Sequence, residues 1–419
     1  MKVKILPSKS HGAVKIPPSK SNAHRAIICA ALSNGKSTLS NIDYSVDIQT
    51  TIDCMRKLGA QIQCFKDSVE IIGIQDFNHL SNNQIECNES GSTLRFLIPI
   101  FSLTNQKVLF TGKNRLLKRP QKVYEDLFKE NNLYFNQTED FIEIEGKIQA
   151  KEYTLKGNVS SQFISGLLFT LPLLEEDSKI HILPPFESKS YIDLTIQMLE
   201  KFNVHVEWEN DLTLFIKGNQ KYLAHDEVIE GDFSQFAFFA VLGAINHDIE
   251  IKGMDAHSLQ GDKQILDILH AFGCEFTLKN SIYKIKQSHL TAKPIDLKNC
   301  PDLGPILCTL AMFSNGVTHI FNASRLRLKE SDRIEAMVSE CAKMGCNIEV
   351  KDDEMYIHGN YHTPSIELDG WKDHRIVMAC AIALTKLGGT IHGCEAITKS
   401  YPSFFEDLKS VGIEVMIYD

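Results

Sequence analysis

The sequence has 419 residues, of which 43% are hydrophobic and 23% are charged, a composition that can bury sizeable cores and favours two or more domains. The net charge of -9 argues against general nucleic-acid binding, although local groups of cations can still collect an anionic substrate. No apolar run approaches the length that spans a bilayer, and residues 1–15 lack a signal-peptide pattern, so we expect a cytoplasmic protein. The 11 cysteines are scattered without a CxxC pair, which predicts reduced thiols and no metal site.

A motif recurs six times, at intervals of about 70 residues, which suits a small folded unit rather than a solenoid repeat. Each copy begins with a polar turn that leads into an apolar helix. Turn and helix together span residues 19–32, 90–103, 160–174, 232–245, 302–313 and 373–387. A short strand is expected after each helix, for example over residues 107–110, 179–183, 249–252 and 317–321.

Each copy continues with a second, amphipathic helix that ends at a residue suited to the left-handed conformation. These residues are Gly59, Asn132, Asn203, Gly273, Gly345 and Gly412. An alternating strand follows, for example over residues 346–350. In five copies a second strand completes a hairpin, as in residues 204–206 with 212–216. Each copy is therefore predicted to be a βαβαββ unit.

The sixth copy reaches Asp419 without a return strand, whereas residues 2–6 form a spare strand at the other end of the sequence. We expect the spare strand to complete the sixth copy, because an open array of six units would leave an unpaired sheet edge. This pairing predicts two domains of three units each, residues 1–16 with 228–419 and residues 17–227. The chain would cross between them near residues 15–18 and 222–230.

The two kinds of helix predict the layers of each domain. The first helix of each unit is apolar on nearly all sides and should be buried, whereas the second is two-faced and should pack outward. Buried helices inside outer sheets and helices would make each domain an inside-out α/β barrel. The polar tips of three buried helices would then meet at one end of each domain, and two facing ends would form a ligand cleft.

The first helix tip reads Ser-Lys-Ser-Asn-Ala-His-Arg over residues 19–25. A helix N-terminus offers unpaired N–H groups and a partial positive charge, which favour an anion. Lys20, Ser21 and Arg25 add an ammonium, a hydroxyl and a guanidinium, so the tip is suited to phosphate. The simpler alternative is that Ser19 or Ser21 only caps the helix and both cations are solvated.

The next two tips carry matching groups. The second contains Gly91, where a ligand can approach the backbone closely, and Arg95, which is equally consistent with a structural ion pair. The third begins Ser160-Ser161-Gln162, which has more hydrogen-bonding groups than a helix cap requires. These groups indicate recognition of hydroxyls or phosphate.

Further charged groups precede the later helices. Asp302 and Asp373 begin the fifth and sixth apolar helices, where either carboxylate is an ordinary N-cap in the simplest interpretation. Arg119, Lys399 and the charged run of residues 327–333 precede second-type helices, where a cation opposes the helix dipole. Cations in these places are better explained if an anion binds among them.

Together, in this order and at these intervals, the motifs resemble the EPSP synthase family over the whole chain. The motifs are Pro18-Ser19-Lys20-Ser21 with Arg25, Ser90-Gly91, Arg119-Pro120, Ser160-Ser161-Gln162-Phe163, Lys329-Glu330-Ser331-Asp332-Arg333, Asp373-His374-Arg375 and Lys399-Ser400-Tyr401-Pro402. The resemblance implies two domains of three βαβαββ units that close on the substrates. It also implies transfer of the enolpyruvyl group of phosphoenolpyruvate to the 5-hydroxyl of shikimate 3-phosphate, with release of phosphate, in the shikimate pathway.

The resemblance also implies the residues that bind each substrate. Shikimate 3-phosphate would be bound by Lys20, Ser21, Arg25, Ser160, Ser161, Gln162, Ser188, Asp302, Arg325 and Lys329. Phosphoenolpyruvate would be bound by Lys20, Gly91, Arg119, Gln162, Arg333, Arg375 and Lys399. The catalytic residues would be Asp302 as the base on the hydroxyl, Glu330 as the proton donor, and Lys20, which would touch both substrates. Tyr191 either stacks near the shikimate ring or belongs to the core.

The implied partners are these two small molecules alone, with no cofactor, metal, nucleic acid or membrane, and the protein is expected to be a monomer. The chain departs from the commonest family pattern at Glu89 and Arg325, where Asn is usual, at Leu326, where Trp is frequent, and at Ser190, where Pro is common. A carboxylate at Glu89 is unexpected beside an anion subsite.

Two alternatives remain open from the sequence. The first is the sister enolpyruvyl transferase that acts on UDP-N-acetylglucosamine, but that enzyme lacks the Ser-Ser-Gln phosphate grip and uses a loop cysteine that residues 112–119 do not contain. The second is a non-catalytic anion-binding repeat protein. The presence of both Asp302 and Glu330 disfavours it, because extra carboxylates do not help to bind anions.

Overall fold

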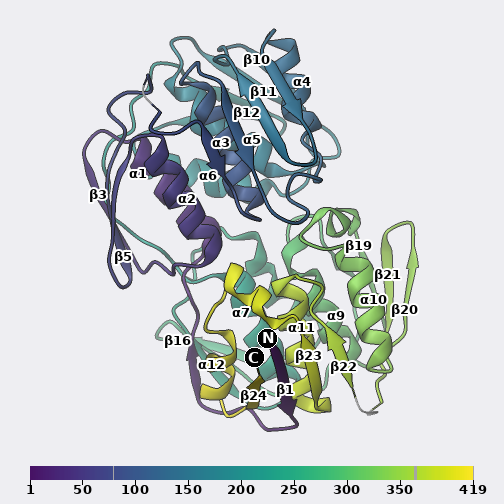
Figure 1. The fold of residues 1–419 in the computed structure, drawn as a ribbon. Coiled ribbons are helices and arrows are strands. Elements are labelled where there is room, and N and C mark those ends of the chain that lie inside the picture. Colours follow the sequence, from purple (N-terminus) through teal and green to yellow (C-terminus); the bar gives the residue numbers. More distant parts are fainter. Residues whose placement is uncertain (79, 363–365, 419) are drawn as a thin grey trace. The chain divides into compact units, whose positions relative to one another are not determined.

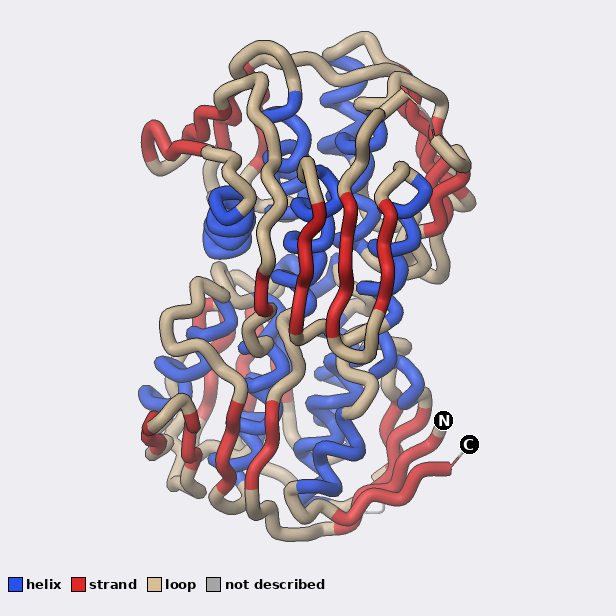
Figure 2. The backbone as a smooth tube through the Cα atoms, turned by 90° about the vertical axis from the view of Figure 1, so that its left-hand side faces the viewer, coloured by secondary structure: helices blue, strands red, loops and turns tan. Residues whose placement is uncertain are grey.

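The computed structural model describes residues 1–78, 80–362 and 366–418. The chain divides into two compact units, Ser19–Ile229 and Met1–Pro18 with Glu230–Asp419. We name the first the continuous unit and the second the split unit. Within each unit the strands lie outside the buried helices (Figure 2). The fold class is the mixed α/β architecture that the sequence predicted, with separate open sheets and no closed barrel among the described strands.

The six predicted apolar helices are confirmed. They are α1 (Lys20–Leu32), α3 (Gly91–Ser102), α5 (Ser161–Thr170), α7 (Phe233–Ile245), α9 (Gly304–Met312) and α11 (His374–Leu387). Every residue of α7 and α9 is buried, because neither helix carries a charged side chain that must reach water. Each unit thus has three apolar helices at its centre.

The second helices are also where the sequence placed them. They are α2 (Val46–Lys57), α4 (Lys122–Glu130), α6 (Lys189–Lys201), α8 (Ile265–Ala271), α10 (Arg333–Lys343) and α12 (Phe404–Ser410). All six residues predicted to end them have a positive φ, from 55° at Asn132 to 110° at Gly59. The left-handed residue reverses the chain and directs it into the following strand.

The continuous unit has three four-stranded sheets with one common order. They are β14 (Glu227–Val228), β3 (Lys36–Ser40), β5 (Ser68–Ile72) and β4 (Gln61–Cys64); β6 (Gln84–Glu86), β7 (Val108–Thr111), β9 (Phe141–Glu145) and β8 (Tyr134–Gln137); and β10 (Glu152–Lys156), β11 (Ser178–Leu183), β13 (Thr213–Ile216) and β12 (Val206–Asn210). In each, the first pair of strands is parallel and the other two pairs are antiparallel.

The split unit repeats this order. Its sheets are β2 (Ala13–Lys15), β15 (Ile249–Lys252), β17 (Ile282–Ile285) and β16 (Phe276–Lys279); β18 (Ile295–Asp296), β19 (Val317–Phe321), β21 (Glu354–His358) and β20 (Ile348–Lys351); and β22 (Glu367–Asp369), β23 (Gly389–His392), β1 (Lys2–Leu6) and β24 (Glu414–Tyr418). Strand β1 occupies the place of the return strand, between β23 and β24 (Figure 1). The prediction that residues 2–6 complete the sixth copy is confirmed.

Two strands begin two residues later than the sequence predicted. Strand β12 begins at Val206 rather than at residue 204, and β20 begins at Ile348 rather than at residue 346. In both cases the residue after the left-handed one still bonds back to its helix, because Val204 N–H donates to the Leu199 carbonyl and Cys346 N–H to the Cys341 carbonyl. The helix cap therefore delays the start of each strand by two residues.

The sequence did not predict an exchange of leading strands. Strand β2 immediately precedes α1 of the continuous unit but pairs with β15 of the split unit. Strand β14 immediately precedes α7 of the split unit but pairs with β3 of the continuous unit. The β3 sheet of the continuous unit therefore takes its outer strand from the segment before α7, and the β15 sheet of the split unit takes its outer strand from the segment before α1.

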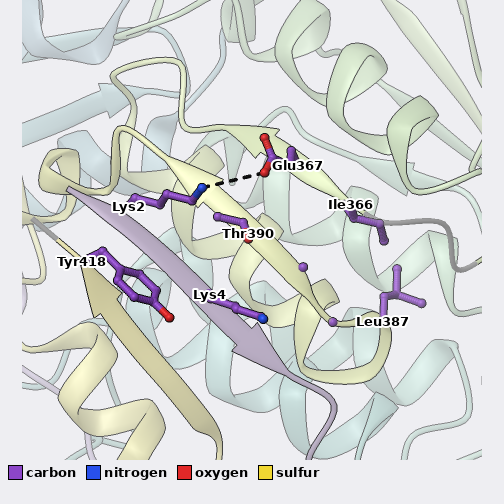
Figure 3. Close-up of a pocket in the computed structure, with 9 residues that line it drawn as sticks. Lys2, Lys4, Ile366, Glu367, Leu387, Thr390 and Tyr418 are labelled. Atoms are coloured by element: carbon purple, nitrogen blue, oxygen red, sulfur yellow. Dashed lines mark ion pairs between the residues drawn. The ribbon is translucent and has the colours of Figure 1, made fainter.

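The solvent face of the β1 sheet carries a shallow hollow of about 610 Å³ (Figure 3). Lys2 and Lys4 of β1, Thr390 of β23 and Tyr418 of β24 line it, and Lys2 lies 3.8 Å from Glu367. None of the residues that the sequence assigned to a substrate lines this hollow. Within the described ranges no helix is long and apolar enough to cross a membrane, and no cluster of side chains could hold a metal ion.

Candidate active site

The tip of α1 holds the first predicted cation beside a carboxylate. Ser19 caps the helix, since its hydroxyl accepts from Asn22 N–H at 3.4 Å. Lys20 Nζ lies 2.8 Å from Asp47 Oδ2, at the start of α2. The capping role is therefore real, and Lys20 is not simply solvated. Its partner Asp47 carried no signal in the sequence, where it reads as an ordinary acidic residue in the first turn of a helix.

Arg25 is a buried cation held only by neutral groups. Its guanidinium donates to Thr195 Oγ1 at 2.9 Å, to the Ser21 carbonyl at 2.8 Å and to the Tyr191 carbonyl at 3.0 Å. Burial lowers the pKa of Arg25 to about 10, although the Tyr191 and Cys29 side chains oppose the shift. No carboxylate of the described residues lies within ion-pair distance of it. A buried charge without a protein counter-ion is suited to an anionic ligand.

The tips of α3 and α5 meet each other. Arg95 Nη1 donates to Gln162 Oε1 at 2.9 Å, and Gln162 Nε2 donates to Ser92 Oγ at 2.9 Å. A Cβ atom added to Gly91 would lie 2.8 Å from Arg119 Nη1 and 3.7 Å from Gln162 Oε1. The structure thus brings together Gly91, Arg119 and Gln162, all of which the resemblance assigned to phosphoenolpyruvate.

The remaining predicted residues of this unit are serines at helix starts. Ser160 caps α5 and accepts from Gln162 N–H at 3.3 Å, and Ser161 is buried in its first turn. Ser188 precedes α6 in the left-handed conformation, with φ of 56°, and is buried. Arg25 is bonded to the Tyr191 carbonyl one turn later in the same helix. Glu89 lies directly before the Ser90 cap of α3 and is partly exposed.

A buried hydrogen-bond chain joins the tips of α1 and α3. His24 Nδ1 lies 2.7 Å from Thr51 Oγ1, which lies 2.7 Å from Thr93 Oγ1, and Thr93 donates to Ser90 Oγ at 2.7 Å. Burial lowers the pKa of His24 well below its ordinary value, and Lys20 and Arg25 add to this shift. The ring is therefore neutral at physiological pH and adds no charge beside the two cations.

In the split unit, Asp302 lies among three cations. Its carboxylate accepts from Lys329 Nζ at 2.9 Å, from Arg333 Nη1 at 3.1 Å and from Arg375 Nη2 at 3.3 Å. Burial raises the pKa of Asp302, but Arg375, Lys329 and Arg333 outweigh this effect and hold it well below its ordinary value. Asp302 is not the helix cap of the simplest interpretation, because it lies within a 3-10 turn, Pro301–Leu303, ahead of α9.

Arg333, the first residue of α10, links three carboxylates. Its guanidinium lies 2.8 Å from Glu330 Oε2, 3.1 Å from Asp302 Oδ1 and 2.9 Å from Asp373 Oδ2. Burial lowers the pKa of Arg333, but Asp373, Glu330 and Asp302 together raise it above its ordinary value. The side chain is 1% exposed and is thus a fixed positive charge at the centre of the cluster.

Asp373 has a larger role than the N-cap that its position suggested. It caps α11 by accepting from Arg375 N–H at 2.9 Å, and it also accepts from Ser331 Oγ at 3.0 Å and binds Arg333. Sequence reasoning missed this second role because the partners are 40 or more residues away.

The other predicted cations of the split unit have defined places. Arg375 Nη1 donates to the Asp302 carbonyl at 3.2 Å and Arg375 Nη2 to Ser234 Oγ at 3.0 Å. Lys399 Nζ donates to the Lys372 carbonyl at 2.8 Å, next to Asp373. Arg325 Nη2 donates to the Lys298 carbonyl at 2.7 Å. Leu326 is buried against Gly304, the first residue of α9, and Gly304 lies two residues after Asp302 in the sequence.

Known proteins with similar sequences and structures indicate the same family as the motifs. A family model described as EPSP synthase (3-phosphoshikimate 1-carboxyvinyltransferase) matches residues 6–408. The chain belongs to the EPSP synthase family. That family resemblance, expected from the motifs, is confirmed.

Several relatives match this chain over nearly the whole length of both sequences. A 3-phosphoshikimate 1-carboxyvinyltransferase of Clostridium kluyveri is 45% identical over 418 residues, which cover 99% of this chain and 98% of the relative. One of Clostridium perfringens is 46% identical over 416 residues, 98% of each chain. The solved EPSP synthase of Acinetobacter baumannii has a TM-score of 0.82 at 25% identity and covers 99% of this chain and 100% of its own. The enolpyruvyl transferase NikO of Streptomyces tendae, with a TM-score of 0.79 at 13% identity, shares the fold; the match covers 99% of this chain and 98% of that one.

Proposed function

We propose that the two side-chain clusters described above bind and convert the substrates of EPSP synthase. The chain is an enolpyruvyl transferase that moves the enolpyruvyl group of phosphoenolpyruvate onto the 5-hydroxyl of shikimate 3-phosphate and releases phosphate. The observation that carries the assignment of residues is the Asp302 carboxylate, which contacts Lys329, Arg333 and Arg375 while Glu330 binds the same Arg333.

The continuous unit supplies groups suited to a phosphate ester. Arg25 is a buried guanidinium with no carboxylate partner among the described residues, and Ser160 and Ser161 stand at a helix tip whose free N–H groups favour an anion. We assign Lys20, Ser21, Arg25, Ser160, Ser161, Gln162 and Ser188 to shikimate 3-phosphate. Gly91 and Arg119, which are in near contact, are assigned to phosphoenolpyruvate together with Lys20 and Gln162.

The split unit supplies the acid–base groups and further cations. Enolpyruvyl transfer requires the hydroxyl oxygen to bond to C2 of phosphoenolpyruvate while a proton is added to C3; loss of phosphate from C2 and of a proton from C3 then restores the double bond. We assign Asp302 to remove the hydroxyl proton and Glu330 to protonate C3. Arg333, Arg375 and Lys399 are assigned to phosphoenolpyruvate, and Lys329 and Arg325 to shikimate 3-phosphate.

Substrate binding should change the basicity of Asp302. Three cations now hold its pKa well below the ordinary value, although burial opposes them, so the carboxylate is a weak base without ligand. Phosphate and carboxylate groups that bind to Arg375, Lys329 and Arg333 would share those cations. The pKa of Asp302 would then rise toward its ordinary value, which favours proton transfer from the hydroxyl.

The assignment is tested by phosphate release from phosphoenolpyruvate, measured with shikimate 3-phosphate or with UDP-N-acetylglucosamine as acceptor. Asp302→Asn and Glu330→Gln should each lower kcat by about 10²- to 10⁴-fold, the range of a lost acid–base group. A matched control is Glu354→Gln, which removes a carboxylate paired with His319 in the same unit. Near-normal kcat in either site variant would remove that residue's role, and activity with the sugar nucleotide alone would overturn the assignment of substrate.

We also propose that the compact units correspond to two domains, residues 17–227 and residues 1–16 with 228–419, and that the protein is a cytoplasmic monomer. The separate hydrophobic core of each unit supports the division into domains. Sedimentation at several concentrations tests the monomer, since a dimer would sediment at about twice the mass of 47.3 kDa.

A further inference from the structure

The loop between β22 and α11 contains two consecutive residues in the left-handed conformation. Trp371 and Lys372 have φ values of 51° and 52°, and neither is a glycine or an asparagine. Side chains with a Cβ atom rarely adopt this region, and two in succession persist only where the surroundings hold them. The cause of this backbone conformation must therefore lie in the contacts of the loop.

The carboxylate of Glu340 makes two of those contacts. Asp369 Oδ1 also accepts from Trp371 N–H at 2.6 Å, and Gly370 N–H donates to the His392 carbonyl at 2.8 Å. Glu340 lies on α10 and is 0% exposed. Its Oε1 accepts from Trp371 Nε1 at 2.8 Å, and its Oε2 accepts from Asp369 N–H at 2.9 Å, so the two oxygens bind both ends of the turn. Lys343, one turn along α10, neutralises the buried charge with Nζ at 2.8 Å from Oε2. The carboxylate thus fixes the loop with charge-assisted hydrogen bonds.

The loop in turn fixes cations of the site. The Lys372 carbonyl accepts from Lys399 Nζ at 2.8 Å, and its orientation depends on the left-handed conformation of Lys372. The next residue, Asp373, binds Arg333 Nε at 2.9 Å and caps the helix that carries Arg375. Rotation of the two left-handed residues to ordinary φ values would move all three cations from their present places.

We propose that Glu340 is a positioning residue for the phosphoenolpyruvate subsite, acting through the left-handed turn at Trp371 and Lys372. The inference rests on the proposed function, because it takes Arg333, Arg375 and Lys399 as ligands of phosphoenolpyruvate. Glu340 itself touches no substrate. From its buried position on α10, Glu340 stabilises the left-handed turn that holds Arg333, Arg375 and Lys399 in their observed positions.

The experiment compares Glu340→Gln with Trp371→Phe and with a control. The amide of Gln keeps one acceptor but turns an NH₂ group toward the other donor, so one anchor of the turn is lost; Phe removes only the indole donor. The control is Asn246→Ala, which deletes buried hydrogen bonds to the Ser8 carbonyl and Thr385 Oγ1 in the same unit. It lowers stability without a contact to the loop.

The expected result is selective. Glu340→Gln should raise KM for phosphoenolpyruvate by about tenfold or more, as expected for a lost charge-assisted hydrogen bond, while KM for shikimate 3-phosphate stays within about twofold. Trp371→Phe should change KM in the same direction by a smaller factor. Asn246→Ala should lower Tm and leave both KM values unchanged.

Hydrogen exchange provides a readout that does not depend on activity. Amides of residues 369–376 should exchange faster in Glu340→Gln than in the wild type and should be unaffected in Asn246→Ala. Faster exchange with an unchanged KM for phosphoenolpyruvate, or an equal rise of both KM values, would overturn the proposal. A wild-type protein without enolpyruvyl transfer would instead refute the proposed function, whatever the exchange data show.

Discussion

Asp302 illustrates how one side chain links the stability of the protein to its chemistry. Burial raises the pKa of its carboxyl, but Arg375, Lys329 and Arg333 outweigh burial and lower the pKa in the folded protein well below the ordinary value. A carboxyl of this kind stabilises the fold at pH values above its unfolded pKa, and this contribution is lost as the pH falls toward the folded pKa. The stabilisation should therefore be complete at neutral pH and decrease below about pH 4.

We predict that Asp302→Asn lowers the free energy of unfolding by about 1–3 kcal/mol at pH 7, because the charged partners of the carboxylate lose an acceptor. The difference between wild type and variant should shrink between about pH 4 and pH 2, where the wild-type carboxyl becomes protonated. Urea unfolding monitored at several pH values measures both quantities. A difference that is constant over this range would show that the ion pairs do not control the pKa of Asp302.

The start of α3 allows a prediction at the level of one element. Gly91 is the first residue of the helix, where Ala is compatible with the backbone and is the better helix former by up to about 1 kcal/mol. A Cβ atom there would nevertheless lie 2.8 Å from Arg119 Nη1, which is too close, so the guanidinium must move. Substrate binding and stability should therefore respond in different ways.

We predict that Gly91→Ala leaves Tm unchanged or slightly raised and increases KM for phosphoenolpyruvate by about tenfold, with a smaller effect on kcat. Thermal unfolding and steady-state kinetics check the two parts separately. Ser92→Ala, at the next position of the same helix, is the comparison: it removes a hydroxyl that binds Gln162 but adds no atom near Arg119. An equal rise of KM in both variants would argue against displacement of Arg119.

The elements that the sequence predicted are those with a long, regular signal. The apolar helices follow from the hydrophobic periodicity of the sequence. The residues that end the second helices follow from residue type, because glycine and asparagine are the residues that most readily adopt the left-handed conformation. The exchange of β2 and β14 could not be predicted, because strands of three and two residues carry too little pattern to specify a partner. The place of strand β1 was predictable only because the sixth repeat has no return strand of its own, so its sheet needed one from another part of the sequence.

The candidate site was predictable in its positive charges and less so in its carboxylates. Arg25, Arg333 and Arg375 stand in recognisable motifs, and each lies at a helix tip as expected. Glu340 gave no such signal, because a glutamate on an amphipathic helix usually faces solvent. The position of Glu340 on the helix does indicate burial. Glu340 is three residues after Met337, which faces the core, so both residues lie on the buried face of α10.

At the scale of the whole molecule, the segment of residues 1–18 belongs to a unit that is otherwise built from residues beyond 229. Ile5 of β1 is 0% exposed and pairs with both Gly389 of β23 and Val415 of β24. Loss of this side chain should weaken the split unit alone. Ile71 of β5 occupies the same place in a sheet of the continuous unit and is also 0% exposed, so it provides the matched comparison.

We predict that Ile5→Ala costs about 2–5 kcal/mol and lowers amide protection within residues 230–418, whereas Ile71→Ala has the same cost and lowers protection within residues 19–229. Hydrogen exchange under native conditions resolves the two regions. Protection lost throughout the chain in both variants would show that the units do not unfold separately.

The position of β1 has a consequence for synthesis on the ribosome. The strand is translated well before the partners that flank it, which lie beyond residue 388. At elongation rates of about 5–20 residues per second, about 20 s or more pass between the synthesis of β1 and that of β23 and β24. During that interval β14 emerges and the sheets of residues 19–229 have all their strands, while β1, with its buried Val3 and Ile5 side chains, has neither of its partners. Chaperones that bind extended segments would find a target in this unpaired strand.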